Sequence, residues 1–346
     1  MTVYIFGGSN TAAIGGWGDG LALRLLRRVP TQNLGLAATN TLNALVRLKG
    51  DVALRPDDVV VWGNAINDAI CMHHCDYPDG LFIEYLEAMI VHCRDSGARF
   101  IPVLLDSFDQ VLFGAQPDYA AQVIDLLGYY DLEYLHLPEQ FHAETGMTQF
   151  QRRDFNDVLH MTPHGELSEF AADLAAELIA LGKGYPARKP RSHLPADTQF
   201  EVCSDFREQS QQGPFLNFGL DVTAWQPPVS IFPKQIDGYG TTIEAVTLIA
   251  APDTGRMKMN VGAQTVPLAA THKFQGVHLG FCLTTCVPLI AGSDVSVGFG
   301  ETVNIEWDES TNDIPIDSYF RADETTARRQ GSEARVLSIL LRRLKR

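Results

Sequence analysis

Hydrophobic residues in positions 1–183 follow two patterns that alternate along the chain. Short β-branched and apolar runs are typical of buried strands, and between them apolar residues recur every three or four positions, as in amphipathic helices. The runs predict strands at residues 3–6, 31–34, 58–62, 100–105 and 134–137. The periodic segments predict helices at residues 21–28, 41–49, 81–95, 119–128 and 163–181. Strands that alternate with helices predict an α/β fold, here a three-layer α/β/α sandwich with a parallel sheet.

The last predicted helix of this region has signals at both ends. Thr162 is a residue type that favours the N-cap position, and Pro163 suits the first helical position. Gly182 ends the periodic pattern, as glycine commonly does after a helix. We therefore place the end of the first domain at about residue 183.

The pattern changes after residue 183. Residues 184–197 are rich in proline and basic residues and have no hydrophobic periodicity, which predicts a linker between domains. Residues 198–325 consist of short apolar runs separated by Gly, Pro, Asp and Asn, a pattern typical of an all-β sandwich, which we interpret as an accessory domain. The predicted strands of this domain are residues 215–222, 242–250, 256–261, 277–282, 295–299 and 302–307.

Residues 326–346 form a basic tail. Between residues 327 and 346, seven lysine and arginine residues stand against one acidic residue, Glu333. Apolar residues between positions 336 and 344 share one face at helical spacing. The tail is therefore predicted to be a basic amphipathic helix, which either contacts an anionic membrane surface or an acidic partner, or packs on its own acidic domain.

The overall composition places the chain among folded globular proteins. Of its 346 residues, 45% are hydrophobic and 20% are charged. The 27 Lys and Arg residues are outnumbered by 42 Asp and Glu residues, and the resulting net charge of −15 disfavours binding to nucleic acid. No nucleic-acid partner is therefore expected.

The sequence predicts neither a membrane span nor export. No stretch approaches the ~20 apolar residues of a transmembrane helix, and the start of the chain lacks the parts of a secretory signal. We expect a cytoplasmic protein, with any contact at the inner membrane face peripheral and made through the tail. The six cysteines are too sparse for a disulfide scaffold and are expected to be reduced thiols.

Ser9 lies directly after the first predicted strand, in the segment Phe6-Gly7-Gly8-Ser9-Asn10-Thr11. In a doubly wound parallel sheet, ligands bind at the carboxyl ends of the strands, so this serine stands at the edge where a functional site is expected. The glycines before it allow a tight turn and the close approach of a substrate. Neither a G-x-G-x-x-G pattern nor the lysine-bearing P-loop spacing surrounds it, which argues against a nucleotide phosphate site.

A second candidate pair precedes the last helix of this domain. Asp157 and His160 are three residues apart, a spacing at which a loop can bring the carboxylate against Nδ1 of the imidazole. Such a pairing fixes the tautomer and leaves Nε2 free to accept a proton from a hydroxyl. A turn capped by Asp157 beside a half-buried His160 is the alternative interpretation.

Together, four segments of the first domain resemble, in order, the sequence blocks of the SGNH hydrolase family, also called GDSL-like lipases and esterases. The segments are residues 5–11 (IFGGSNT), 33–39 (NLGLAAT), 55–68 (RPDDVVVWGNAIND) and 157–165 (DVLHMTPHG). Gly8 stands where the first block of the family has Asp. The resemblance covers about residues 1–183 and implies a flavodoxin-like fold, whereas the β-rich domain resembles no family that we recognise.

The resemblance implies a catalytic triad of Ser9 as nucleophile, His160 as base and Asp157 as the residue that orients the base. It also implies an oxyanion hole formed by the backbone N–H groups of Ser9 and Gly35 and by one asparagine side chain. Either Asn64 or Asn67 can supply that side chain. We favour Asn67, because an Asp follows it as in the family pattern.

The activity implied by the resemblance is that of a serine esterase. We expect it to remove O-acyl groups, with acetyl as the expected group, from a carbohydrate or a small ester, with no cofactor and no metal. An O-acyltransferase of polysaccharide biosynthesis that uses the same triad is one alternative. A catalytically silent glycan-binding or assembly protein is the alternative of a different class.

We assign no function to three weaker candidate sites. Cys71 and Cys75, with two histidines between them, offer four soft ligands, but adjacent side chains on a short segment point apart and no second cluster completes a tetrahedral metal site. His164 is expected to be an exposed helix residue rather than a second base. Trp225 and Trp307 are expected in the core of the β domain rather than on a sugar-binding surface.

Overall fold

The computed structural model describes residues 1–74, 80–147, 149–206, 212–217, 220–225, 227–250, 256–269, 283–289, 295–308 and 335–345. The chain divides into two compact units, Met1–Leu194 and Pro195–Arg346. The division falls inside the segment 184–197 for which the sequence predicts a linker.

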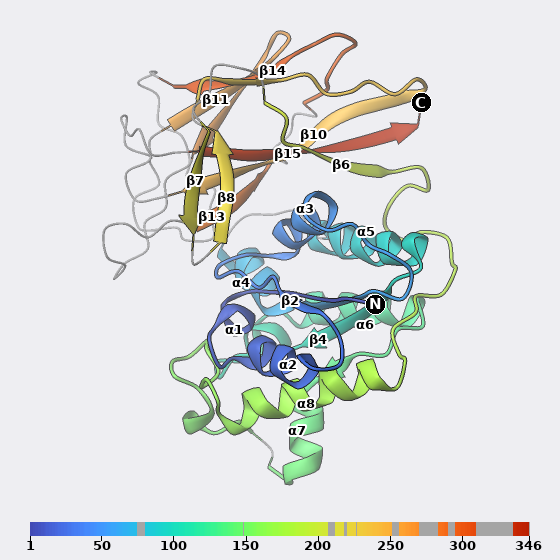
Figure 1. The fold of residues 1–346 in the computed structure, drawn as a ribbon, viewed down its shortest axis with the longest axis vertical. Coiled ribbons are helices and arrows are strands. Elements are labelled where there is room, and N and C mark those ends of the chain that lie inside the picture. The colour runs from blue at the N-terminus through green and yellow to red at the C-terminus, as the bar shows by residue number, and fades with distance from the viewer. Residues whose placement is uncertain are drawn as a thin grey trace. The chain divides into compact units, whose positions relative to one another are not determined.

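The first unit is built on a five-stranded parallel sheet with the strand order β2-β1-β3-β4-β5 (Figure 1). Its strands are β1 Val3–Gly7, β2 Thr31–Asn33, β3 Val59–Gly63, β4 Arg99–Leu104 and β5 Leu135–His136. Every residue of β3 and β4 is buried, which explains why these strands read as continuous apolar runs rather than as alternating ones. The predicted parallel α/β fold is confirmed.

Helices cover both faces of this sheet. They are α1 Ser9–Ala12, α2 Trp17–Leu25, α3 Thr41–Gly50, α4 Ala65–His74, α5 Leu81–Ser96, α6 Pro117–Tyr129, α7 Leu137–Thr145 and α8 Glu166–Ala180. In Figure 1, α2 and α8 lie on one side of the sheet and α3 and α5 on the other. On the side of α2 and α8, the strand residues Ile5, Val61 and Val103 form one apolar core with Trp17 and Leu167.

The last helix of the first unit begins later than predicted. α8 starts at Glu166 with Gly165 as its N-cap, so the prediction of Thr162 as N-cap is wrong. His164 has a φ of 54°, in the left-handed region, and a helix cannot run through such a residue. The Thr162 hydroxyl instead donates a hydrogen bond to the carbonyl of Arg153.

Residues 184–194 of the predicted linker are anchored within the first unit. The carboxylate of Glu87 on α5 is fully buried and accepts backbone N–H bonds from Ser192, His193 and Leu194 at 2.6, 2.9 and 2.7 Å. It also accepts a hydrogen bond from the Tyr130 hydroxyl at 2.8 Å. Burial alone would raise the pKa of Glu87, but these donors outweigh burial and lower that pKa below its ordinary value.

The second unit consists of two antiparallel sheets. The first has the order β13-β10-β15-β8-β7, with β6 paired to β15, and the second has the order β12-β11-β14-β9. The strands are β6 Gln199–Cys203, β7 Gln212–Asn217, β8 Leu220–Trp225, β9 Val229–Ile231, β10 Tyr239–Ala250, β11 Arg256–Val261, β12 Gln264–Ala269, β13 Leu283–Pro288, β14 Val303–Trp307 and β15 Arg335–Lys345. Val246 and Ile339 of the first sheet share one apolar core with Met259 and Ile305 of the second. An all-β region is thus confirmed here.

Individual strands of this unit differ from the sequence expectation. The run at 215–222 belongs to two strands, because β7 and β8 form an antiparallel pair in which Leu216 lies opposite Asp221. The run at 295–299 contributes one bridge, between Ser296 and Thr242. The predicted strand at 277–282 lies outside the described residues.

The prediction of an amphipathic helix in the basic tail is wrong, because residues 335–345 form strand β15. The strand pairs with β10 on one edge and with β6 and β8 on the other. The consecutive residues Ile339, Leu340 and Leu341 are all buried, so both faces of the strand carry buried apolar residues and the sequence shows no simple alternation. Arg343 is fully buried and donates hydrogen bonds to Glu201 at 2.7 Å and to the Thr241 hydroxyl at 2.9 Å.

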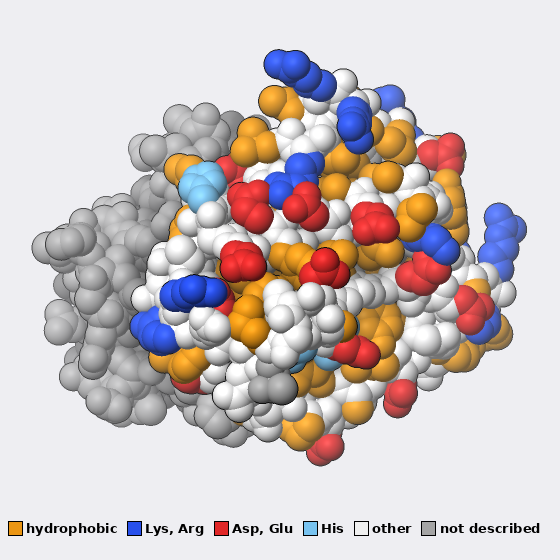
Figure 2. Space-filling model, turned by 90° about the horizontal axis from the view of Figure 1, so that it is seen from below, with side chains coloured by type: hydrophobic (Ala, Val, Ile, Leu, Met, Phe, Trp, Pro, Cys, Tyr) orange, Lys and Arg blue, Asp and Glu red, His pale blue; other side chains and the backbone are white. Residues whose placement is uncertain are grey.

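One face of the protein carries both acidic and basic side chains. Figure 2 shows acidic side chains across the middle of one face, with Lys and Arg side chains mainly nearer its edges. Within the described ranges, the helices include none that is long and apolar enough to cross a membrane.

Candidate active site

Ser9 lies at the carboxyl end of β1 and is the first residue of the short helix α1. Its side chain is partly exposed. The N–H of the first residue of a helix has no preceding turn whose carbonyl could accept it, so the Ser9 amide can donate to a bound group. The strand-to-helix turn thus presents a hydroxyl and a backbone donor from the same residue.

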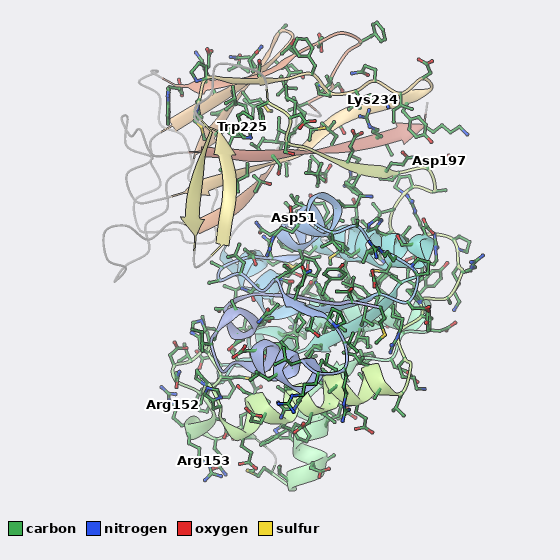
Figure 3. The ribbon with its side chains drawn as sticks, in the orientation of Figure 1. Asp51, Arg152, Arg153, Asp197, Trp225 and Lys234 are labelled. Carbon is green, nitrogen blue, oxygen red and sulfur yellow. The ribbon has the colours of Figure 1, made fainter. Side chains whose placement is uncertain are left out.

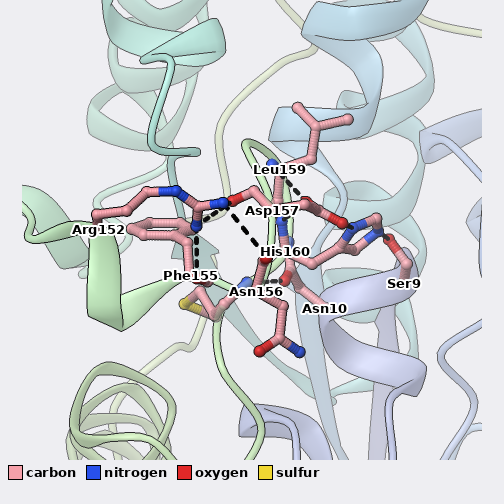
Figure 4. A network of polar contacts seen from close by, with 9 residues as sticks. Ser9, Asn10, Arg152, Phe155, Asn156, Asp157, Leu159 and His160 are labelled. Carbon is pink, nitrogen blue, oxygen red and sulfur yellow. Dashed lines mark hydrogen bonds and ion pairs between the residues drawn. The ribbon is translucent and has the colours of Figure 1, made fainter.

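The structure brings Ser9, His160 and Asp157 into one row of hydrogen bonds (Figure 4). His160 Nε2 lies 2.8 Å from Ser9 Oγ, and His160 Nδ1 lies 2.7 Å from Asp157 Oδ2. Asp157 Oδ1 accepts the backbone N–H groups of Leu159 and His160, both at 2.8 Å. The spacing of three residues therefore gives the local turn that the sequence predicts.

The electrostatics of this row favour one arrangement of protons. Partial burial would raise the pKa of Asp157, but the hydrogen bond from the His160 ring and the two backbone N–H donors outweigh it and lower that pKa. An ionised Asp157 favours the proton on His160 Nδ1, which leaves Nε2 as the acceptor for the Ser9 hydroxyl. The side chains of Asp157 and His160 are 55% and 41% exposed, so a large substrate can reach them.

Of the two candidate asparagines, the structure places Asn67 beside the Ser9 turn. A Cβ atom on Gly8 would lie only 2.2 Å from Asn67 Oδ1 and 2.5 Å from Asn67 Nδ2, so this amide packs directly on the Gly8 backbone. Asn64 is fully buried, and its Nδ2 donates to the carbonyl of Thr39 at 3.1 Å. Asn67 is therefore the asparagine that is positioned to contact a group bound at Ser9.

The Gly35 N–H is expected in the oxyanion hole, but in the structure it already donates to another residue. Its N–H donates to Asn33 Oδ1 at 3.0 Å, and Asn33 Nδ2 donates in turn to the carbonyl of Thr11 at 2.9 Å. Gly35 packs closely against α1, since a Cβ atom here would lie 2.9 Å from the Ala12 nitrogen. The loop after β2 thus lies against the Ser9 helix, but its Gly35 amide is directed to Asn33.

A buried polar cluster supports α4, and sequence reasoning missed it. Asp68 accepts hydrogen bonds from the Thr41 N–H at 2.7 Å and from the Tyr119 hydroxyl at 2.7 Å. Burial raises the pKa of Asp68 to about 7 although these donors oppose the rise. The cluster links the start of α3, the start of α4 and α6 directly next to Asn67.

Arg152 is a second residue that the sequence did not single out. It belongs to the 3-10 turn Arg152–Asp154 and is labelled in Figure 3. Its Nη1 donates to the carbonyl of Phe155 at 2.6 Å, and Figure 4 shows further contacts to the carbonyls of Asn156 and Asp157, both at 3.4 Å. Arg152 therefore supports the loop that carries Asp157.

The weaker candidates lie apart from this site or outside the described residues. The backbone N–H of His164 donates to the Gly15 carbonyl, and its ring lies 4.0 Å from Glu169 rather than at Ser9. Cys71 is buried, whereas Cys75 lies outside the described residues. Among the residues that the structure describes, no group of three or more His, Cys, Asp and Glu side chains could hold a metal ion. Trp225 and Trp307 pack against the core of the second unit.

Comparison of the sequence with protein-family models and with curated proteins finds no match. Comparison of the structure finds a two-domain esterase active on acetylated mannans, 12% identical, with a TM-score of 0.59 over 98% of this chain and 90% of that one. The same esterase co-crystallised with mannopentaose gives a TM-score of 0.58 with the same coverage. A putative lipolytic protein of the G-D-S-L family from Desulfitobacterium hafniense is 15% identical, with a TM-score of 0.42 over 51% of this chain and 98% of that one. Over almost its whole length, the chain therefore shares its fold with a two-domain esterase.

Proposed function

We propose that the protein is a serine esterase that removes acetyl groups from a carbohydrate, with Ser9, His160 and Asp157 as its catalytic residues. One observation carries the proposal: the continuous row of hydrogen bonds from the Asp157 carboxylate through His160 to Ser9 Oγ. This row ends at the carboxyl edge of the sheet, where such folds bind their ligands.

The first half of the reaction forms an acyl enzyme. Ser9 Oγ attacks the carbonyl carbon of the ester while His160 Nε2 takes the hydroxyl proton, and Asp157 stabilises the resulting imidazolium. When the tetrahedral intermediate collapses, the bond to the alcohol oxygen breaks and His160 gives its proton to that oxygen. The alcohol leaves, and the acyl group remains on Ser9.

The second half releases the acyl group. A water molecule gives a proton to His160 while its oxygen attacks the acyl carbonyl carbon. Collapse of the second tetrahedral intermediate breaks the bond to Ser9 Oγ, which regains the proton from His160. The products are the free carboxylic acid and the starting enzyme.

The oxyanion of both intermediates requires donors. We assign this role to the Ser9 N–H and to the Asn67 side chain, which packs beside Ser9 on Gly8. Each such donor contributes roughly 3 kcal/mol to transition-state stabilisation. The proposal gives the Gly35 amide no part, because that amide donates to Asn33.

The carbohydrate ester as substrate rests on the two-domain similarity. A protein of the same two-domain fold is an esterase active on acetylated mannans. The half-exposed His160 and Asp157 suit a substrate too large to be enclosed. Acetylated manno-oligosaccharides are therefore the first substrates to test.

The test compares the wild type with Ser9→Ala on p-nitrophenyl acetate and on acetylated manno-oligosaccharides. Ser96→Ala at the end of α5 is the matched control, because α5 leads into the amino end of β4, away from the Ser9 edge. We expect Ser9→Ala to abolish acetate release and Ser96→Ala to leave it unchanged. Equal rates in wild type and Ser9→Ala would refute the proposal. Acetyl transfer to an added sugar, without free acetate, would identify an acyltransferase instead.

A further inference from the structure

Asn10, the residue directly after Ser9, connects the Ser9 turn to the loop that carries His160. Its Nδ2 donates to the carbonyl of Leu159 at 3.0 Å, and both residues are labelled in Figure 4. Its Oδ1 accepts the backbone N–H of Met161 at 2.8 Å. The two partners flank His160 in the sequence. One side chain therefore holds the backbone on both sides of the proposed base.

The other contacts of His160 cannot replace this connection. Asp157 orients the imidazole, but it belongs to the same loop and moves with it. The hydrogen bond from Asn156 N–H to the His160 carbonyl is also internal to the loop. The Phe108 N–H also holds the loop by donating to the Val158 carbonyl at 3.1 Å, but Phe108 lies outside the segment after β1. Bonds between the loop and the segment after β1 hold His160 relative to Ser9 directly.

Among the described residues, two hydrogen-bonded links join the loop to that segment besides the contact of His160 with Ser9. One is the pair of bonds made by Asn10, and the other is the bond from His164 N–H to the Gly15 carbonyl at 2.7 Å. His164 lies four residues beyond His160, whereas Leu159 and Met161 adjoin it directly. Asn10 is also only 8% exposed, so water competes little for its amide.

We propose that Asn10 is a positioning residue of the esterase, which sets His160 Nε2 at hydrogen-bond distance from Ser9 Oγ; this inference rests on the proposed function. A carboxamide carries a donor and an acceptor, so it matches the C=O of Leu159 and the N–H of Met161 at once. A carboxylate of the same size can satisfy only Met161, and it repels the Leu159 carbonyl.

The expected effect is on the chemical step rather than on substrate binding. A displacement of about 1 Å in reacting groups costs on the order of a hundredfold in rate. We expect Asn10→Ala to lower kcat by about ten- to hundredfold and to leave KM within about twofold. The rate is expressed per active serine, titrated with a fluorophosphonate, so that loss of folded protein does not enter kcat.

The variant Asn10→Asp gives a pH-dependent kcat that is not expected if Asn10 only stabilises the fold. A protonated carboxyl can donate to Leu159 and accept from Met161, which restores both hydrogen bonds. We expect the ratio of kcat of Asn10→Asp to that of Asn10→Ala to rise as the pH falls from about 8 to about 5. Dividing by the Asn10→Ala rate removes any pH dependence that the two variants have in common.

The matched control is Asn260→Ala in the second unit. Asn260 also donates one side-chain hydrogen bond, to Glu306, and accepts one, from Thr265. We expect this variant to keep the wild-type kcat.

If Ser9→Ala is inactive, any one of three outcomes would overturn the inference that Asn10 positions His160. These are a wild-type kcat in both Asn10 variants, a change in KM alone, and a kcat ratio that is independent of pH. An active Ser9→Ala variant would instead overturn the proposed function, so the two failures are distinguishable.

Discussion

The side chain of Asn67 fills the space beside Gly8 in which any larger residue would place its Cβ atom. The distances from that Cβ position to Asn67 Oδ1, Cγ and Nδ2 are 2.2, 2.5 and 2.5 Å, far closer than real Cβ contacts. The SGNH pattern has Asp at the position of Gly8. In this chain the glycine is therefore a packing requirement of the asparagine rather than a missing carboxylate.

Gly8→Ala and Gly8→Asp are expected to displace Asn67 and to lower kcat by about a hundredfold, the effect of losing one oxyanion donor. Asp at this position, although it matches the SGNH pattern, should not raise activity. Kinetics on p-nitrophenyl acetate check this, together with the double variant Gly8→Ala/Asn67→Ala. If Gly8→Ala acts through Asn67, the second substitution adds little to the first.

Gly128→Ala is the control for the loss of a glycine. Gly128 lies in α6, and a Cβ atom there would meet nothing within 4 Å. We expect this variant to keep full activity and to gain about 0.5–1 kcal/mol in the free energy of unfolding, because alanine is the better helix former. Additive losses in the Gly8→Ala/Asn67→Ala pair would contradict the packing argument.

We expect Asn67→Ala to lower kcat and Asn64→Ala to lower the stability of the fold. Asn67→Ala removes a proposed oxyanion donor, so kcat should fall about a hundredfold with little change in stability. Asn64→Ala leaves the buried Thr39 carbonyl without its donor, so stability should fall by about 1–3 kcal/mol while kcat changes little. Urea unfolding and steady-state kinetics of both variants make the comparison, and the reverse pattern would assign the donor to Asn64.

Asp68 should make the protein less stable as the pH rises. Its pKa is about 7 in the folded chain and about 3.8 as the ordinary value, so between these values the folded state holds a proton that the unfolded state has lost. Stability then falls with rising pH across this window. Relative to Asp68→Asn, the wild type should lose on the order of a few kcal/mol between about pH 4 and pH 7.

His92 is a control, because its effect on stability changes with pH in the opposite direction to that of Asp68. Burial lowers the pKa of His92 to about 4, so its contribution to stability increases as the pH rises toward its ordinary value of 6.5. Urea unfolding of the wild type, Asp68→Asn and His92→Gln at several pH values separates the two groups. Parallel curves for the wild type and Asp68→Asn would show that Asp68 titrates normally.

Glu87 should protect residues 188–193 from proteolysis. Glu87→Gln keeps one side-chain acceptor but turns an NH₂ group toward backbone donors, which should cost about 1–3 kcal/mol and loosen the segment. Trypsin should then cleave faster after Arg188 and Arg191. The exposed Glu177 on α8 gives the control, Glu177→Gln, which should be cleaved at the wild-type rate. An unchanged cleavage rate in Glu87→Gln would show that the segment is held by other contacts.

The features that the sequence predicted are determined by residues that lie close together in the chain. β3 and β4 were evident because strands buried on both faces are apolar runs. The contact between Asp157 and His160 follows from their spacing, since both belong to one turn. These features require no knowledge of how distant segments meet.

The features that are hard to predict from the sequence depend on contacts between residues that lie far apart in the chain. Asn10 meets Leu159 and Met161 only because the sheet brings residues about 150 positions apart to one edge. The sequence favours Asn67 over Asn64 only because an Asp follows it, and the contact of the Asn67 side chain with Gly8 becomes evident only in the folded chain. Strand β15 looked helical because its apolar residues recur at helical spacing, whereas in the folded chain it pairs with three other strands.

The pairing of β15 also determines the order in which the second unit can fold. During synthesis β6, β8 and β10 leave the ribosome long before residues 335–345, which lie opposite all three: Arg343, for example, aligns with both Gln199 and Thr241. Until then the edges of β6 and β10 that β15 later covers have no partner strand, and such open edges readily pair with other chains. We therefore expect chaperones to bind the nascent second unit in the interval between the synthesis of β10 and that of β15.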